Sequence, residues 1–268
     1  MDKIALVTGG TSGIGRVAAQ ALIQRGYTVA IVGRHPEATA NAIGAIPFTA
    51  DFASLAEVRD LATAVRKRFD RLDVLVNNAG AIYAKRQLSR DGYEMTFAVN
   101  HLAPFLLTNE LWSLLKPGAR VVNVASEASR GFRIDFADLQ GKKYFVWKAY
   151  GRSKLANLLF TAELSRRLPG VDVNALHPGL VQTGFGGASW INTAMRLLKP
   201  FTRTPERGAQ TTIWLADEAP AGTTGKYFMD KHEKRPTKAA LDVAAQQRLW
   251  AESERLVESA LAQRRATV

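Results

Sequence analysis

Tyr150 and Lys154 are four residues apart in a stretch with helical periodicity, so both side chains fall on one face of the helix. A phenol has an ordinary pKa of about 10, which is too high for a base at neutral pH. A neighbouring ammonium group favours the phenolate and lowers that pKa. The pair could therefore exchange a proton with a reacting oxygen. Without other evidence, however, two such residues usually form an ordinary surface pair.

A glycine-rich loop could hold a ligand beside such a pair. Residues 8–15, TGGTSGIG, follow the apolar run 4–7 directly and lead into a helical pattern. A strand, a glycine turn and a helix opening point backbone N–H groups at one spot, where the helix N-terminus adds partial positive charge. Gly9 allows the tight turn, Gly13 the close approach of a ligand, and Gly15 close packing of the helix on the sheet. We expect a pyrophosphate here, with Thr11, Ser12 and Ile14 completing its contacts, although such turns also serve structural roles.

Apolar, β-branched runs alternate with helical patterns along the chain. The runs are 4–7, 28–32, 74–76, 121–124 and 171–176, and the helical patterns are 16–25, 55–69, 150–168 and 238–261. This alternation predicts βαβ units and an α/β fold, with a parallel sheet covered on both faces. Ser54 and Glu57 have the spacing of a capping box, so we expect a helix to begin at Leu55.

The composition bounds the class of protein. The chain has 268 residues, of which 47% are hydrophobic, so we expect a single domain over 1–268. It contains no cysteine, which excludes disulfides and thiolate metal sites; we expect no metal and a cytoplasmic protein. No segment has the pattern of a signal peptide or a membrane span, because polar residues and glycines interrupt the uncharged stretch 173–195.

The formal net charge is +12, which could favour nucleic acid, an anionic membrane surface or an anionic ligand. The basic residues are scattered along the chain, however. Their densest cluster, Lys231 to Arg235, contains Glu233 and has no interleaved row of aromatic residues. We therefore expect a solvated basic surface and no nucleic-acid partner.

Several motifs occur together in one order along the chain. They are TGGTSGIG at 8–15, Asp51 after the third strand, NNAG at 77–80, Asn100, Ser126, Tyr150 with Lys154, and Pro178-Gly179. This ordered set resembles the short-chain dehydrogenase/reductase family over most of the chain. The resemblance implies one Rossmann-type doubly wound domain, usually of seven parallel strands, that binds a nicotinamide dinucleotide. LQGKKY at 139–144 and HPGLVQT at 177–183 look most like the branch of retinol dehydrogenases and WW-domain oxidoreductases.

The resemblance implies roles for particular side chains. Tyr150 is the acid/base, Lys154 also holds the ribose hydroxyls of the nicotinamide half, and Asn100 fixes a water that links the lysine to solvent. Ser126 hydrogen-bonds the substrate carbonyl, with Ser129 as the second candidate. The resemblance also implies three further groups of cofactor contacts. Asp51 and Phe52 bracket the adenine ring, and Asn78, Ala79 and Gly80 lie along the adenosine side. Val181 and Thr183 belong to the segment that contacts the carboxamide of the nicotinamide. His177, which precedes a proline at a strand end, is expected to be structural.

The end of the second strand bears on the choice of nicotinamide cofactor. A site for NAD(H) places an acid there to hold the ribose 2′-hydroxyl. Here the position holds Gly33-Arg34-His35, and the first acid is Glu37. A guanidinium group can grip a 2′-phosphate, so we expect NADP(H) in preference to NAD(H). The alternative is that Arg34 only points to solvent.

The combined expectation is an NADP(H)-dependent oxidoreductase that interconverts an aldehyde or ketone and its alcohol. Residues 184–205 carry tryptophan, leucine and phenylalanine at helical spacing, which indicates a lid and a lipophilic substrate. The interval from Ser126 to Tyr150 is longer than usual in the family, so an insertion at 131–147 borders the pocket. It could obstruct the usual dimer contact, and both a monomer and a homodimer stay open. The alternative function is a non-catalytic NADP(H) sensor or scaffold.

Overall fold

One sheet organises the computed structural model, which describes residues 2–181 and 202–265. Within those residues the sheet has eight strands in the order β3-β2-β1-β4-β5-β6-β7-β8, parallel except where β7 meets β8. The strands are β1 (Ile4–Thr8), β2 (Thr28–Gly33), β3 (Ile46–Thr49), β4 (Leu72–Asn77), β5 (Leu115–Val124), β6 (Asp172–His177), β7 (Tyr227–Met229) and β8 (His232–Lys234). The predicted doubly wound α/β fold is confirmed, and a short antiparallel strand joins the seven parallel ones.

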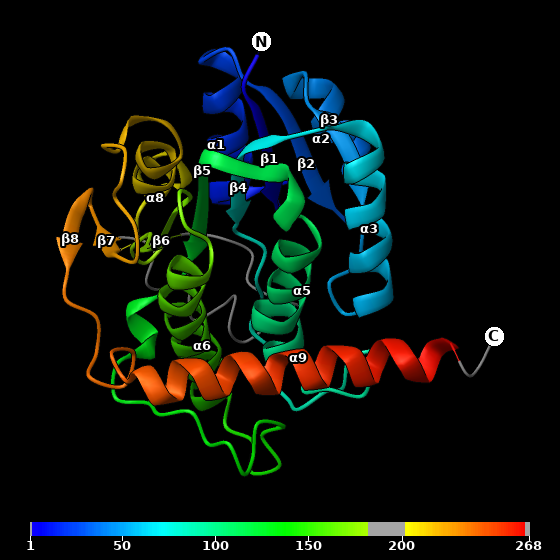
Figure 1. Ribbon diagram of the computed structural model, residues 1–268, viewed down its shortest axis with the longest axis vertical. Helices are drawn as coiled ribbons and strands as arrows, with labels where there is room; N and C mark the ends of the chain where they lie inside the picture. The colour runs from blue at the N-terminus through cyan, green and yellow to red at the C-terminus, as the bar shows by residue number, and fades with distance from the viewer. Residues whose placement is uncertain (1, 182–201, 266–268) are drawn as a thin grey trace.

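Helices cover both faces of this sheet (Figure 1). On one face lie α1, α2 and α8; on the other lie α3, α5 and α6, with α9 across them. Their bounds are α1 (Gly13–Gln24), α2 (Glu37–Ile43), α3 (Leu55–Arg68), α4 (Met95–Phe97), α5 (Ala103–Glu110), α6 (Val146–Arg167), α8 (Pro205–Ile213) and α9 (Val243–Arg265). Two π-helical turns, Ala98–Leu102 and Trp214–Glu218, and two 3-10 turns, Trp112–Leu114 and Glu127–Ser129, complete the regular structure of the described residues.

Alternate side chains of the central strands enter two different cores. In β1, Ala5 and Val7 pack beneath α1, whereas Leu6 packs on the side of α3 and α5. All three are fully buried. Because successive side chains of a strand point to opposite faces, a strand covered on both faces must be apolar throughout. This explains why the strand signal in the sequence is a continuous apolar run.

The helix ends follow the sequence signals closely. Helix α1 ends at Gln24, and Gly26 has φ +83°, the left-handed conformation that favours glycine after a helix. Helix α3 begins at Leu55, where the Ser54 hydroxyl accepts a hydrogen bond from the Glu57 N–H at 3.4 Å. In a full capping box the Glu57 carboxylate would accept from the Ser54 N–H. Here it accepts from the Asp51 N–H, so only half of the expected capping box forms. Helix α6 begins at Val146, earlier than the expected 150.

The strand order reverses direction between β1 and β4, which are hydrogen-bonded neighbours near the middle of the sheet. The chain leaves β1 toward β2 on one side and leaves β4 toward β5 on the other. The segments that follow these two strands therefore part from each other and leave a crevice at the carboxyl edge of the sheet. In open α/β folds ligands bind at this switch point.

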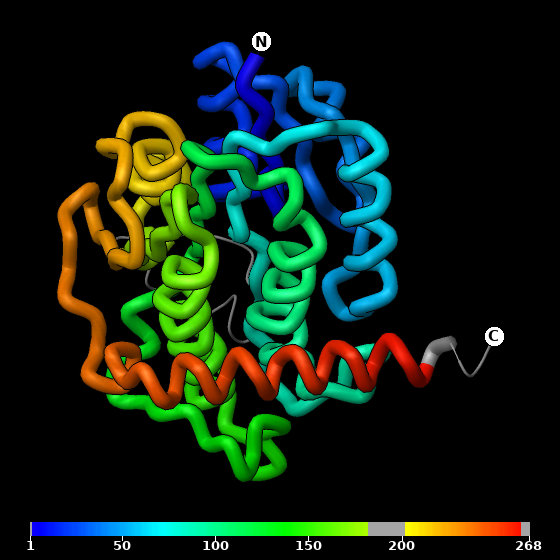
Figure 2. The backbone as a smooth tube through the Cα atoms, in the orientation of Figure 1, coloured from blue at the N-terminus to red at the C-terminus, as the bar shows by residue number. Residues whose placement is uncertain are grey.

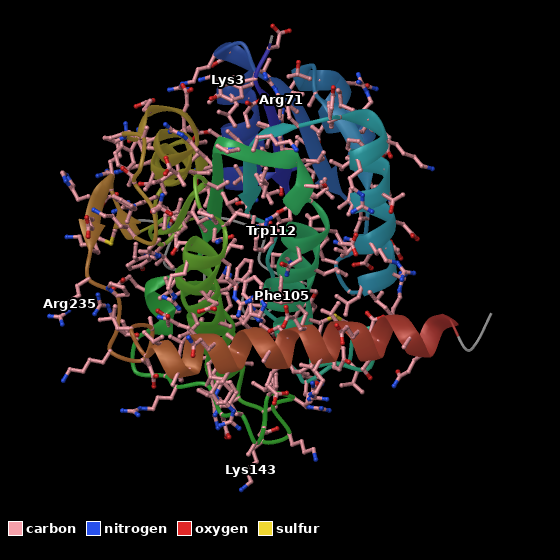
Figure 3. The ribbon with its side chains drawn as sticks, viewed as in Figure 1. Lys3, Arg71, Phe105, Trp112, Lys143 and Arg235 are labelled. Carbon is pink, nitrogen blue, oxygen red and sulfur yellow. The ribbon has the colours of Figure 1, made fainter. Side chains whose placement is uncertain are left out.

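Helix α9 runs across the helices of one face and holds them together (Figure 2). Trp250 is its main anchor, with its ring stacked on Phe160 of α6 at 5.9 Å between centroids and edge-on to Phe105 of α5 at 4.9 Å. Figure 3 labels Phe105 where α5 approaches α9. The predicted helix at 238–261 forms and packs as an outer layer, but it begins at Val243. Among the described residues no helix has both the length and the apolar character needed to cross a bilayer.

We expect Trp250→Ala to lower the free energy of unfolding by about 3–5 kcal/mol, because it removes a buried aromatic ring that joins α9 to α5 and α6. Urea denaturation followed by circular dichroism measures this loss. Leu241→Ala, at a position 45% exposed just before the same helix, is the control and should change stability by about 0.5 kcal/mol or less. Equal effects of the two substitutions would contradict the anchoring role.

Candidate active site

A cavity of about 800 Å³ opens at the carboxyl edge of the sheet, at the switch point. It brings together most of the candidate residues from distant parts of the chain. Those on its wall are Gly9, Thr11, Ser12, Gly13, Ile14, Arg34, Asp51, Phe52, Asn78, Ala79, Gly80, Ser126, Tyr150, Lys154 and Val181. Gly15 and Asn100 lie behind the wall, and the second-choice serine, Ser129, is buried away from it. Thr183 and all of the expected lid before residue 202 lie outside the described residues.

The glycine loop borders the cavity and is held by the segment that directly follows β4, the neighbour of β1 in the sheet. Gly9 and Gly13 have φ of +64° and +52°. A Cβ on Gly15 would lie 2.5 Å from the Asn78 amide nitrogen, and it would overlap the carbonyl of Gly9. The close approach expected at Gly15 is therefore to the loop itself and to Asn78, which donates to the Thr8 and Gly9 carbonyls at 2.8 and 3.3 Å.

The start of α1 has the properties of an anion site. Ser12 occupies the N-cap position, yet its side chain makes no capping hydrogen bond to the first turn. The N-terminal N–H groups of a helix need partners, and an anion can provide them. Gly13 and Ile14, at this end of the helix, border the cavity. The shape and the donor set of this wall fit the diphosphate of a dinucleotide.

Arg34, Asp51 and Phe52, which lie after β2 and β3, border another part of the cavity. Arg34 follows β2 directly, is exposed, and forms no ion pair within residues 2–181 and 202–265. Glu37, the first acid after it, accepts a hydrogen bond from the Thr49 hydroxyl at 3.0 Å. A guanidinium without an acidic partner in the described part of the chain is free to bind an anionic group of a ligand.

Ser126 and Tyr150 meet on the cavity wall from different elements. Ser126 follows β5, and its hydroxyl accepts from the Ala128 N–H at 3.1 Å, which starts a 3-10 turn. The Tyr150 phenol lines the same cavity, and Ser126 acts to lower the pKa of that phenol. The serine therefore caps the turn and also lies beside the phenol. A ligand oxygen placed between these two hydroxyls could accept hydrogen bonds from both.

Burial sets the protonation of Tyr150 and Lys154 in the free protein. Burial raises the pKa of Tyr150 to about 12, and Ser126 offsets only part of this rise. In the free protein, desolvation of the phenol therefore outweighs the lowering expected from Lys154. The reason is that desolvation penalises the phenolate and acts on the ammonium as well, since burial lowers the pKa of Lys154 to about 8.

Lys154 sits one helical turn beyond Tyr150, as expected, and its Nζ lies 5.7 Å from the centre of the tyrosine ring. The same ammonium donates to the Val124 carbonyl at 2.8 Å. Asn157, nearly one turn further on, donates to the same carbonyl at 3.4 Å. The end of β5 therefore holds the lysine in place at the cavity wall.

Asn100 has a structural partner that the sequence did not indicate. It lies in the π-helical turn between α4 and α5, and such turns are frequent at functional sites. Its amide pairs with both backbone groups of Ala81, accepting from the N–H at 2.8 Å and donating to the carbonyl at 2.9 Å. It also donates to the Ser153 hydroxyl at 3.0 Å. Asn100 thus joins the segment after β4 to the helix that carries Tyr150.

A row of buried polar side chains also ties α5 and α6 to the sheet, and the sequence analysis did not identify it. Asn77 and Asn123 are register partners at the ends of β4 and β5, and the Asn77 amide donates to Asn123 at 2.9 Å. Asn77 also donates to Thr108 of α5 at 3.0 Å, and Asn123 donates to Thr161 of α6 at 2.9 Å. The row fixes how far α5 and α6 stand from the strand ends.

The other end of the cavity is apolar. Ile82, Trp147 and Leu180 border it, and Trp147 and Leu180 are each 45% exposed. Trp147 precedes Tyr150 by three residues on α6, so that both face the cavity. This spacing was a signal in the sequence that could have identified Trp147. His177 also borders the cavity, and its Nδ1 accepts from the Glu127 N–H at 3.4 Å, as a structural histidine would.

Comparisons with known proteins agree with this geometry. The sequence profile of the short chain dehydrogenases matches residues 3–192. The chain is 40% identical to human retinol dehydrogenase 13, over 95% of this chain and 84% of that protein. It is also 40% identical to a protein from Streptomyces sp. (strain C5) named provisionally as daunorubicin C-13 ketoreductase DnrU, over 92% of this chain and 90% of that one. A solved structure, the Pseudomonas aeruginosa RhlG/NADP active-site complex, is 31% identical with a TM-score of 0.66, over 84% of this chain and 93% of that chain.

We expect Lys154→Met to stabilise the protein at pH 7 by about 2–3 kcal/mol. The folded pKa is lowered from 10.5 to about 8, so at pH 7 the fold bears the full cost of a buried ammonium. Between pH 8 and 10.5 the unfolded chain binds more protons, wild-type stability rises, and the advantage of the variant disappears. Urea unfolding at pH 7 and pH 10 measures this. Lys67→Met, at an exposed lysine of α3, is the control for the loss of one positive charge.

Proposed function

Because this chain belongs to the short-chain dehydrogenase family, near its retinol dehydrogenases, we propose that it is an NADP(H)-dependent oxidoreductase acting on a lipophilic carbonyl compound or its alcohol. The observation that carries the proposal is that Ser126, Tyr150 and Lys154 share the wall of one cavity with a glycine loop. A nicotinamide dinucleotide bound there would supply or accept a hydride. The remaining tasks belong to side chains of this chain.

Tyr150 would exchange the proton. With its pKa raised to about 12 the phenol is neutral near pH 7, which suits donation to the oxygen of a carbonyl as that oxygen gains negative charge. Ser126 would hydrogen-bond the same oxygen and hold it within reach. Lys154 would bind the ribose hydroxyls and place a positive charge beside the phenol, which favours proton loss in the oxidative direction.

The cofactor preference rests on Arg34. Its guanidinium borders the cavity at the end of β2 and has no carboxylate partner among the described residues. We propose that it binds a 2′-phosphate, while the first turn of α1 binds the diphosphate and the segment 51–52 borders the adenine. The solved relative titled as a complex with NADP supports this choice.

The substrate would enter over Trp147 and Leu180. Both are large, apolar and nearly half exposed, and they border the end of the cavity that contains Tyr150. Such a lining binds an apolar body and leaves hydrogen bonding to the two hydroxyls on Ser126 and Tyr150. The relatives named as retinol dehydrogenase and daunorubicin ketoreductase support a bulky lipophilic substrate.

Tyr150→Phe should lower kcat at least 100-fold and leave the Kd for NADPH within about threefold, because it removes the proton donor but keeps the ring. The measurement is NADPH absorbance with a panel of hydrophobic aldehydes and ketones. Tyr144→Phe is the matched control, since that phenol donates to the Tyr83 carbonyl and does not border the cavity. Equal rates of wild type and Tyr150→Phe would refute the role of this phenol. NADPH binding without turnover of any substrate would favour the sensor or scaffold.

Arg34→Asp should weaken NADPH binding by about 10- to 100-fold, the effect expected when a charge-assisted phosphate contact is lost. NADH binding should change by less than about threefold, because NADH lacks the 2′-phosphate. Fluorescence titration with both cofactors measures the two constants. Lys67→Asp reverses a charge on α3 and controls for the change in net charge. Equal losses for NADPH and NADH would remove Arg34 from the choice of cofactor.

A further inference from the structure

Two neighbouring surface segments beside the cavity carry cations and large apolar side chains together. We call them the basic aromatic patch, defined as Lys85, Arg86, Leu88, Lys142, Lys143, Phe145, Trp147 and Lys148. The two segments are joined, because the Arg86 side chain donates to the Gln140 carbonyl at 3.1 Å and the Tyr144 hydroxyl donates to the Tyr83 carbonyl. Figure 3 shows Lys143 at the tip of a loop that projects from the body of the molecule.

In the stretch 142–148, KKYFVWK, side chains that pack against the protein alternate with side chains that are exposed to solvent. Tyr144 and Val146 pack with Ile82 in a small apolar cluster. Phe145 lies between these two residues and is 59% exposed, and Trp147 follows Val146 and is 45% exposed. Leu88 on the neighbouring segment is 50% exposed. Anchored neighbours therefore hold these apolar groups in the solvent, where a soluble protein gains nothing from them.

Among the described residues, acids neutralise little of the patch's positive charge. Lys85, Arg86, Lys142 and Lys143 are exposed and form no ion pair within the described ranges 2–181 and 202–265. Of the nearby acids, Asp138 lies at the patch itself and interacts with the Lys142 charge, whereas Asp135 and Glu94 are engaged elsewhere. Asp138 accepts from the Lys142 N–H at 2.9 Å, Asp135 pairs with Arg152 at 3.3 Å, and Glu94 accepts from the first N–H groups of α4.

We propose that the basic aromatic patch docks this protein on the surface of a bilayer that contains anionic phospholipid. Tryptophan and phenylalanine among lysines are the residues that bind the boundary between headgroups and acyl chains, and lysine at an anionic surface adds about fivefold in affinity. A protein partner fits less well, because lysine is depleted from protein interfaces and their centres exclude charge.

The position of Trp147 gives the docking a consequence. This side chain belongs to the patch and also borders the cavity, so the apolar end of the cavity opens at the docked face. A lipophilic substrate could then pass from the bilayer to the cavity without crossing water. This consequence rests on the proposed function, whereas the docking itself does not.

The test is sedimentation of the full chain with vesicles of phosphatidylcholine mixed with phosphatidylglycerol, and with vesicles of phosphatidylcholine alone. We expect binding to the anionic vesicles only, weakening as salt is raised. The triple variant Lys85→Glu, Lys142→Glu, Lys143→Glu should lose about 100-fold or more in affinity. The control Lys234→Glu, Arg235→Glu, Lys238→Glu makes the same change in net charge at exposed positions, and Figure 3 shows Arg235 well away from Lys143.

Phe145→Ser tests the apolar contribution without changing charge, and it should weaken vesicle binding about 10-fold while the thermal midpoint of unfolding stays within a few degrees. Equal loss in the two triple variants, equal binding to neutral and anionic vesicles, or retention on immobilised polyglutamate but not on vesicles would each overturn the proposal. Turnover of a water-soluble aldehyde by the first triple variant should stay at the wild-type rate. If the protein binds anionic vesicles but turns over no carbonyl compound, the docking is supported and only the proposed function is refuted.

Discussion

The paired asparagines at the ends of β4 and β5 fix the positions of everything that gathers at the cavity. Asn77 and Asn123 are register partners and are hydrogen-bonded to each other. Asn77 also donates to Thr108 of α5, and Asn123 donates to Thr161 of α6. The chain beyond the first asparagine is the segment that holds the glycine loop. Asn123 is followed by Val124, whose carbonyl accepts from Lys154, and then by Ser126. A buried amide without such partners would cost several kcal/mol, so this register is strongly selected.

Burial has opposite effects on the two ionisable groups of the candidate site. It moves the pKa of Tyr150 up to about 12 and that of Lys154 down to about 8, so burial shifts both groups toward their neutral forms. Near pH 7 the phenol of the free protein is neutral, whereas most of the lysine is still charged. Under the proposed function, an oxidised nicotinamide would add positive charge and a reacting ligand oxygen would add negative charge. The protonation of the pair would then depend on what is bound, which is a property that a proton-exchanging site requires.

Much of the fold could be predicted from the sequence, and the failures have identifiable physical causes. The apolar runs and glycine signals located β1, α1 and the start of α3, because those features depend on local pattern. Strand β3 is short and half exposed and contains Pro47, so it gives no such pattern. Strand β8 is wholly exposed, and its hairpin turns at Asp230 and Lys231, both with positive φ and without glycine. The candidate side chains were found from motif order, but the π-helical turn that turns Asn100 toward Ala81 depends on tertiary contacts.

The location of unpaired charge says more than the net charge of +12. Many of the basic side chains are held in place by acids: Arg166 and Arg167 both pair with Glu163, and Arg25 pairs with Asp217 and Glu218. These groups stiffen helix ends and attract little from solution. The cations around Phe145 have no such partners among the described residues, so their field extends into solvent on the side where the cavity opens. A scattered excess of lysine and arginine in the sequence thus becomes a directional feature once the fold shows which of these residues have partners.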